Sequence, residues 1–306
     1  MITRRHVLSG AASVVATSVV GPALSQEKIK EKIKVVATFS IIADLVRNVG
    51  GGRLDIASLV GPNGDAHVYV PSPADAKTLA AAKAVVVNGL GFEGWIERLV
   101  KASGTKAPVI LASQGVKPRR QDGGHDHDHA DVDPHAWQSV ANAMIYVANI
   151  RDALASLDPS AKAAYEANAN AYLARLDALD KEVRAEIAKI PADRRRIITT
   201  HDAFGYFGAA YGVALIAPSG VTTESEPSAR DVARIITQIR RERIPAVFLE
   251  NVTDPRMLER ISRESGAKIG GTLYSDALTD DKGEAPTYID MMRHNVRQLA
   301  SALVVG

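Results

Sequence analysis

The sequence has 306 residues, which is enough for two domains of ordinary size, each with its own hydrophobic core. Its 37 basic and 35 acidic residues nearly balance, so it lacks the strongly basic surface typical of proteins that bind nucleic acids or anionic membranes. It contains no cysteine, which excludes disulfides, thiolate metal ligands and a lipid-modified cysteine.

The first 25 residues have the pattern of an export signal. Arg4 and Arg5 precede a small, apolar run at 7–20, and small residues predict cleavage after Ser25. The apolar run is shorter than the roughly 20 residues that a membrane span requires. We therefore expect an exported, soluble protein of the bacterial periplasm, without a lipid anchor and monomeric.

Short apolar runs alternate with helical patterns in the first half of the mature chain. Ser72 and Pro73 have the residue types of a helix N-cap and a first helical position. This alternation predicts a parallel sheet with helices on both faces. The expected strands are 34–39, 54–60, 84–90 and 108–113, and the expected helices are 41–49, 71–82, 95–103 and 136–157.

A long helical pattern follows, from Pro159 to about Ile190. It has no interior glycine or proline and is rich in Ala, Leu, Glu and Lys. At 1.5 Å per residue such a helix reaches roughly 45 Å, which is longer than a helix within one domain usually is. We therefore expect a rigid helix that links two lobes.

The alternation of strands and helices then resumes. The fold class predicted is α/β, with two similar parallel-sheet lobes joined by one long helix. The expected division is a signal at 1–25, a first lobe at 26–157 with a polar loop at about 114–133, a linking helix at 158–190, and a second lobe at 191–306. The strands expected in the second lobe are 196–200, 214–218, 246–250 and 268–274, and the helices are 202–212, 228–244, 254–266 and 287–303.

Four side chains that can bind metal follow predicted strands, where open α/β sheets bind their ligands. His67 follows strand 54–60, His135 follows the fourth strand and its polar loop, His201 ends strand 196–200, and Asp276 follows the last strand. Any one of them alone could be a solvated loop residue. Three neutral imidazoles and one carboxylate match a tetrahedral zinc shell, which the two lobes would have to assemble between them.

Three more histidines, His125, His127 and His129, alternate with aspartates in the polar loop. Because His-rich tracts bind metal, we expect an auxiliary, weak capture of zinc that raises its local concentration near the cleft. The simpler interpretation is a solvated loop that binds metal only incidentally. His294 lies in the middle of the last predicted helix and is not expected to be a ligand.

Five segments together resemble the zinc and manganese solute-binding proteins of ABC transporters, the cluster A-I group. They cover nearly the whole mature chain in the same order: "GDAHVYVPSPADAKTLAAAKAVVVNGLGFEGW", "DVDPHAWQSVANA", "TTHDAFGYFGAAYGV", "ESEPSARDVARI" and "YSDALTD". The resemblance implies a metal held between two α/β lobes by His67, His135, His201 and Asp276. It also implies a membrane permease as partner, with a periplasmic zinc metallochaperone as a candidate donor.

The identity of the metal depends on His201. Manganese-binding members of the group tend to carry glutamate in that segment, whereas imidazole suits zinc and copper. The sequence therefore predicts a periplasmic protein that captures Zn²⁺ and delivers it to an ABC permease for import. A manganese-specific protein of the same family is the alternative.

Two further classes of function compete with transport. A zinc hydrolase needs an open coordination position, and a shell closed by Asp276 suits capture rather than catalysis, so we do not expect an enzyme. The segment "HDHDHADVDPH" superficially resembles a hydrolase metal motif, but His129 stands where that motif needs aspartate and Ala130 where it needs its last histidine. A surface adhesin with this fold is also conceivable, because fold does not settle function.

Overall fold

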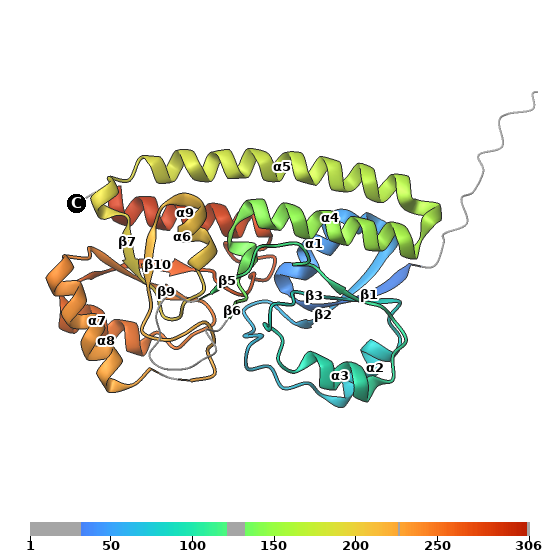
Figure 1. The fold of residues 1–306 in the computed structure, drawn as a ribbon, viewed down its shortest axis with the longest axis horizontal. Helices are drawn as coiled ribbons and strands as arrows, with labels where there is room; N and C mark the ends of the chain where they lie inside the picture. Colours follow the sequence, from blue (N-terminus) through green and yellow to red (C-terminus); the bar gives the residue numbers. More distant parts are fainter. Residues whose placement is uncertain (1–31, 121–131, 226, 305–306) are drawn as a thin grey trace, which may run out of the picture. The chain divides into compact units, whose positions relative to one another are not determined.

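Two four-stranded parallel sheets organise residues 32–120, 132–225 and 227–304, the part of the chain that the computed structural model describes (Figure 1). The first sheet contains β1 (Ile33–Phe39), β2 (Leu54–Val60), β3 (Ala84–Val87) and β4 (Val109–Leu111). The second contains β7 (Arg196–Ile198), β8 (Ala214–Ile216), β9 (Ala246–Glu250) and β10 (Lys268–Leu273).

Both sheets have the same strand order. The first runs β2-β1-β3-β4 and the second, read from its other edge, runs β8-β7-β9-β10. In each, the strand that comes first in the chain lies between the second and the third. This confirms the predicted fold class of two similar α/β halves, and it places a topological switch point at β1 and at β7.

The helices of the first half begin where the sequence predicts. They are α1 (Ser40–Gly50), α2 (Pro73–Ala80) and α3 (Ile96–Ser103). The Ser72 hydroxyl accepts a hydrogen bond from the Asp75 backbone N–H, and the Asp75 carboxylate accepts one from the Ser72 backbone N–H. Pro73 takes the first helical position, so a complete capping box starts α2.

The region around His135 differs from the prediction in two ways. A two-stranded antiparallel pair, β5 (Arg119–Arg120) with β6 (Val132–Asp133), closes the ends of the polar loop and was not predicted. The single helix expected at 136–157 is divided by extended backbone at Ser139 into a 3₁₀ turn, η2 (Ala136–Gln138), and α4 (Val140–Leu157). The short turn is buried, which periodicity alone does not distinguish from a first helical turn.

The long helix, α5, spans Lys162–Ala188 and follows a 3₁₀ turn, η3 (Pro159–Ala161), so it begins three residues later than predicted. It packs against α1, α4 and the last helix, α9 (Tyr288–Val304) (Figure 1). Only one stripe of α5 is buried, with members three or four residues apart: Tyr165, Ala169, Tyr172, Leu176, Leu179, Val183 and Ile187.

The main hydrophobic core is continuous between the two halves. It extends from the first sheet through the buried faces of α4, α5 and α9 to Phe248 and Leu273 in the second sheet. A smaller cluster lies beneath α7 (Ala229–Glu242) and α8 (Arg256–Ser265), while α6 (Gly205–Tyr211) follows β7. Among the described residues, no helix combines the length and apolar character needed to cross a membrane.

Candidate metal centre

The structure brings His67, His135, His201 and Asp276 together. They come from the loop after β2, the turn before η2, the loop after β7 and the loop after β10. One potential ligand atom from each lies within 4.8 Å of those from the others. Residues more than 200 positions apart in the sequence therefore meet at one point, next to the carboxyl ends of both sheets.

The spacing of these atoms suits a tetrahedral ion. Asp276 Oδ2 lies 3.5 Å from His67 Nε2 and 3.1 Å from His201 Nε2, and its Oδ1 lies 3.5 Å from His135 Nε2. His67 Nε2 and His135 Nε2 are 3.2 Å apart. Ligand atoms bonded to one tetrahedral ion at about 2.0–2.1 Å would lie about 3.3–3.4 Å from each other. These four contacts, which involve both Asp276 oxygens, are thus close to the spacing of a tetrahedral shell.

The four side chains are removed from solvent. His135, His201 and Asp276 are 0% exposed and His67 is 8% exposed. Neither carboxylate oxygen of Asp276 has a hydrogen-bond partner of good geometry among the described residues, and its neighbours are the imidazole nitrogens. A buried carboxylate without donors is costly unless a cation faces it, so this donor set fits a metal ion.

Glu250 fixes His201 from the side away from the cluster. Its Oε2 lies 2.7 Å from His201 Nδ1, and its Oε1 accepts hydrogen bonds from the backbone N–H groups of Thr200 and His201 at 2.7 and 3.0 Å. Glu250 ends β9, the strand beside β7 at the switch point of the second sheet. The imidazole is therefore held with Nε2 directed at Asp276.

Asp133 has the same relation to His135. Its Oδ1 lies 2.9 Å from His135 Nδ1 and accepts a hydrogen bond from the His135 backbone N–H at 2.9 Å. Its Oδ2 lies 3.8 Å from Arg119 Nε across the β5–β6 pair. A Cβ at Gly205 would come within 2.5 Å of Asp133 Oδ2, so glycine allows the start of α6 to approach this carboxylate.

Aromatic rings form the wall of the site on the side of the first sheet. The Phe92 ring lies 4.6 Å from the His67 ring and 4.9 Å from the Trp137 ring, and Trp137 lies 5.2 Å from His135. The loop that carries Phe92 needs left-handed backbone at Gly89, Leu90 and Gly91. These rings exclude water, which strengthens every electrostatic interaction inside the site.

Burial and charge act in opposite directions on His201 and Asp276. Burial disfavours the imidazolium, but the carboxylates of Glu250 and Asp276 outweigh it and hold the pKa of His201 well above its ordinary value. Burial also disfavours the carboxylate of Asp276, yet His201 and His135 keep its pKa well below the usual range. Before metal binds, a proton on His201 thus supplies the positive charge that the site requires.

Two side chains of η2 fasten the segment of His135 to the segment of Asp276. Trp137 Nε1 and Gln138 Nε2 both donate hydrogen bonds to the Ser275 carbonyl, at 2.9 and 2.7 Å. Because Ser275 and Asp276 are consecutive, this contact sets the position of the carboxylate relative to His135.

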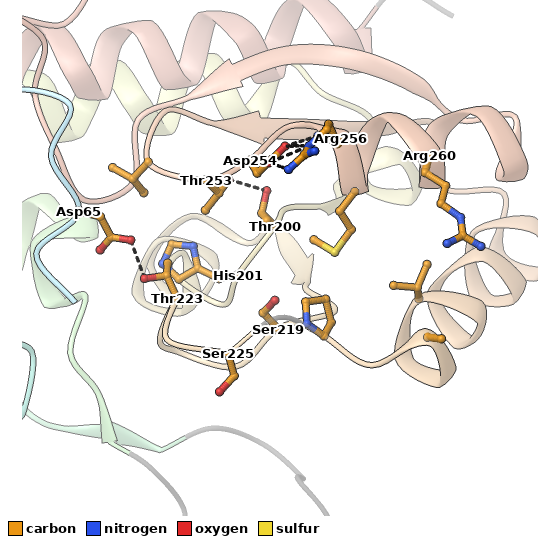
Figure 2. Close-up of a pocket in the computed structure, with 15 residues that line it drawn as sticks. Asp65, Thr200, His201, Ser219, Thr223, Ser225, Thr253, Asp254, Arg256 and Arg260 are labelled. Carbon is orange, nitrogen blue, oxygen red and sulfur yellow. Dashed lines mark hydrogen bonds and ion pairs between the residues drawn. The ribbon is translucent and has the colours of Figure 1, made fainter. Parts of the chain in front are cut away.

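A cavity of about 580 Å³ lies beside His201 in the second half. Figure 2 shows Asp65 at one edge of it, directed at Thr223, with Arg256 and Arg260 at the other. The Thr223 hydroxyl donates to Asp65 Oδ2 at 2.6 Å, while Asp65 Oδ1 accepts from the His67 backbone N–H at 2.9 Å. Asp65 therefore joins the loop of His67 to the loop after β8.

Among the described residues, His294 is the one histidine outside this cluster. His294 is buried in α9, where Nε2 lies 3.0 Å from the Thr272 carbonyl and the ring packs on Tyr274, in agreement with its expected structural role. His125, His127 and His129 lie outside the described residues, so their predicted capture role stays a prediction.

Sequence reasoning missed Asp133 and Glu250. Both had a detectable signal: Glu250 is the last residue of a predicted strand, and Asp133 stands two residues before His135 in "DVDPH". Neither position identified the residue by itself, because carboxylates that contact the outer nitrogen of a histidine, the Nδ1 that faces away from the cluster, have no characteristic spacing in the sequence.

Comparison with known proteins agrees with this architecture. Residues 35–302 match the family described as zinc-uptake complex component A, periplasmic (ZnuA). The chain is 34% identical over 270 residues to the iron-binding protein YfeA of Yersinia pestis, covering 88% of this chain and 86% of that protein. It is 34% identical over 279 residues to the manganese ABC transporter substrate-binding lipoprotein PsaA of Streptococcus anginosus, covering 89% and 90%.

A solved structure shares the fold. The periplasmic zinc binding protein TroA from Treponema pallidum superposes with a TM-score of 0.82 at 31% identity, covering 89% of this chain and 99% of that one. The chain therefore belongs to the ZnuA family of extracytoplasmic, non-enzymatic proteins that bind metal for ABC uptake systems, with a buried site of three histidines and one aspartate for a divalent transition metal.

Proposed function

We propose that this protein binds Zn²⁺ through His67, His135, His201 and Asp276 and delivers it to the permease of an ABC importer. The observation that supports this most is the convergence of three imidazole Nε2 atoms and one carboxylate at separations close to those of a tetrahedron. Zinc favours four nitrogen and oxygen ligands in this geometry, whereas manganese favours more oxygen ligands in an octahedron.

Manganese import is the second candidate. It is favoured by the names of relatives, because PsaA of Streptococcus anginosus is named for manganese, although TroA is named for zinc and YfeA for iron. The two further carboxylates beside the cluster, Glu250 and Asp133, contact the Nδ1 atoms of His201 and His135 at 2.7 and 2.9 Å, on the side of each ring away from the cluster. The donor set that remains is richer in nitrogen than manganese prefers.

Competition between the two metals tests the proposal. Metal-free protein is titrated with zinc against a chelator of known affinity, then with zinc and manganese together, and the bound metal is counted by mass spectrometry. We expect one tight zinc site with a Kd in the nanomolar range or below, about −12 kcal/mol or stronger. A preference for manganese in direct competition contradicts the proposal and supports the alternative.

We also propose that the protein works in the periplasm without a lipid anchor. Residues 1–25 have the pattern of an export signal, and the sequence contains no cysteine to which lipid could be attached. A periplasmic metallochaperone remains a candidate donor of the metal.

The histidines of the polar loop are proposed to collect zinc for the buried site. Deleting 122–130 should leave the affinity of the tight site within about tenfold, a change of no more than about 1.4 kcal/mol, because none of the four proposed ligands is removed. The deletion should abolish weaker zinc binding and slow transfer of zinc from a competing chelator. Transfer at the rate of the parent protein contradicts the capture role.

A further inference from the structure

We propose that Glu250 positions His201 for metal binding and thereby sets the preference of the site for zinc over manganese. This rests on the proposed function in one respect, namely that His201 is a ligand. Glu250 itself does not join the cluster of four potential ligands, and its contribution acts through the imidazole.

The carboxylate of Glu250 is surrounded by donors of a defined kind. Its side chain is fully buried, and Oε1 accepts hydrogen bonds from the backbone N–H groups of Thr200 and His201 at 2.7 and 3.0 Å. Its Oε2 lies 2.7 Å from His201 Nδ1, an ion-pair contact without the angle of a hydrogen bond. A carboxylate is suited to this position because it has only acceptor sites. An amide of the same shape would direct a donor at one of these N–H groups.

The tautomer of His201 follows from this arrangement. A neutral imidazole has one N–H and one lone pair, and a carboxylate oxygen 2.7 Å from Nδ1 favours the N–H on that nitrogen. When a metal ion takes the place of the proton on Nε2, the remaining proton is on Nδ1 and the lone pair lies on Nε2, the nitrogen that faces Asp276 at 3.1 Å. If Nδ1 lost its acceptor, the opposite tautomer would place an N–H at Nε2, where a metal must bind.

Charge distinguishes Glu250 from the other carboxylate that contacts an outer nitrogen. Asp133, which contacts His135, also lies 3.8 Å from Arg119. Among the described residues, His201 is the one cationic side chain in an ion pair with Glu250. With neutral imidazoles, the charges of Asp276 and Glu250 together balance one divalent ion.

This contact should favour zinc more than manganese. A carboxylate on the outer nitrogen raises the basicity of a ligating imidazole, and loss of such a partner commonly reduces metal affinity about 10- to 100-fold. Zinc gains more from a stronger imidazole donor than manganese does, since manganese suits oxygen ligands. Glu250 therefore acts on the ratio of the two affinities as well as on their size.

The test compares Glu250→Gln with a matched variant, Glu93→Gln. Glu93 is also buried and accepts hydrogen bonds from the Thr38 hydroxyl and the backbone N–H groups of Asn88 and Gly89, but it contacts none of the four cluster residues. Zinc and manganese affinities are measured by chelator competition for both variants and the parent. The control reports the effect of placing an amide among buried donors.

We expect Glu250→Gln to weaken zinc binding about 10- to 100-fold and manganese binding less, so that the zinc-to-manganese ratio falls at least about fivefold. Glu93→Gln should leave the ratio within about twofold of the parent, by the same reasoning. A ratio unchanged in Glu250→Gln overturns the inference, whichever metal the parent prefers. A parent protein that binds neither metal tightly contradicts the proposed function instead.

Nitrogen-15 NMR of the imidazoles gives a readout that a loss of stability does not change. In the zinc-loaded parent, His201 should carry its proton on Nδ1. A proton on Nε2 in the parent overturns the inference. Should Glu250→Gln not fold, Glu250→Asp keeps the charge but shortens the side chain by one methylene, and the same fall in the ratio is expected; an unchanged ratio again overturns the inference.

Discussion

At the scale of single residues, the site is an arrangement of charges in which a metal ion can replace a proton. His201 has its pKa raised because, although burial opposes its charge, Glu250 and Asp276 outweigh that effect. Asp276 has its pKa lowered because His201 and His135 outweigh burial. The carboxylate is thus ionised and ready for a cation at neutral pH, while His201 must lose its proton before it can bind one.

Zinc binding should therefore release a proton and depend on pH. Because the proton on His201 competes with the metal, the apparent affinity for zinc is expected to rise with pH until the raised pKa of His201 is passed. Calorimetry at neutral pH in buffers of different ionisation enthalpy should report release of about one proton. Binding heats that do not depend on the buffer contradict this assignment.

The same shifts act on the stability of the metal-free protein. The raised pKa of His201 contributes stability that is fully present below the unfolded value of about 6.5 and is lost as pH rises through the folded value. The lowered pKa of Asp276 contributes stability that is present above about 3.9 and is lost as pH falls through its folded value.

At the scale of elements, the sequence predicts regular structure well because hydrophobic periodicity determines it. The eight strands of the two sheets were predictable in this way, and the residue types of Ser72 and Pro73 predicted the start of α2. The β5–β6 pair, with two residues per strand, is too short to have a period. Extended backbone at Ser139 divides η2 from α4 because Trp137 and Gln138 bind the distant Ser275 carbonyl, a tertiary contact that no local pattern contains.

For the candidate site, the sequence predicts the four converging residues but not the carboxylates that contact them. Strand ends and the quoted motifs point to the four converging residues, since topology brings those ends together. Asp133 and Glu250 depend on hydrogen-bond geometry around two imidazoles, which became visible only in three dimensions.

The contribution of α5 to the free energy of unfolding should come from its buried stripe. Leu176 is 0% exposed in that stripe, so Leu176→Ala is expected to lower the free energy of unfolding by about 2–5 kcal/mol. Asn170→Ala, on the exposed face, should change it by less than about 0.5 kcal/mol. Denaturant unfolding of both variants checks this, and equal losses would show that the stripe is not a core face.

At the scale of the whole molecule, several hydrogen bonds join the halves near the site, including one from the Asn63 backbone N–H to the Leu278 carbonyl and one from the Leu278 backbone N–H to the Ser40 hydroxyl. Two of these contacts differ in burial. One is a pair of buried hydrogen bonds that the Trp137 and Gln138 side chains donate to the Ser275 carbonyl. The other is a single hydrogen bond between partly buried side chains, from Thr223 to Asp65. We propose that the first keeps His135 and Asp276 together and that the second breaks when the metal leaves.

Thr223→Val tests the second part of that proposal. The substitution keeps the volume of the side chain and removes the hydroxyl that Asp65 accepts from. We expect zinc to dissociate faster, by up to about tenfold, because a hydrogen bond to a charged group contributes about 1.5–3 kcal/mol and exposure reduces it. Thr222→Val, whose hydroxyl accepts from the Glu224 backbone N–H, is the control. A dissociation rate equal to that of the control would show that the hydrogen bond between Thr223 and Asp65 does not slow the release of zinc.

X-ray absorption at the zinc edge tests most directly the central claim that His67, His135, His201 and Asp276 hold the ion. The zinc-loaded protein should show four nitrogen and oxygen ligands at about 2.0–2.2 Å, with the scattering pattern of three imidazole rings. His201→Ala should remove one ring from that pattern, and His294→Ala should leave it unchanged, since His294 lies outside the cluster. A six-coordinate shell, or a parent spectrum with fewer than three imidazoles, would contradict the account.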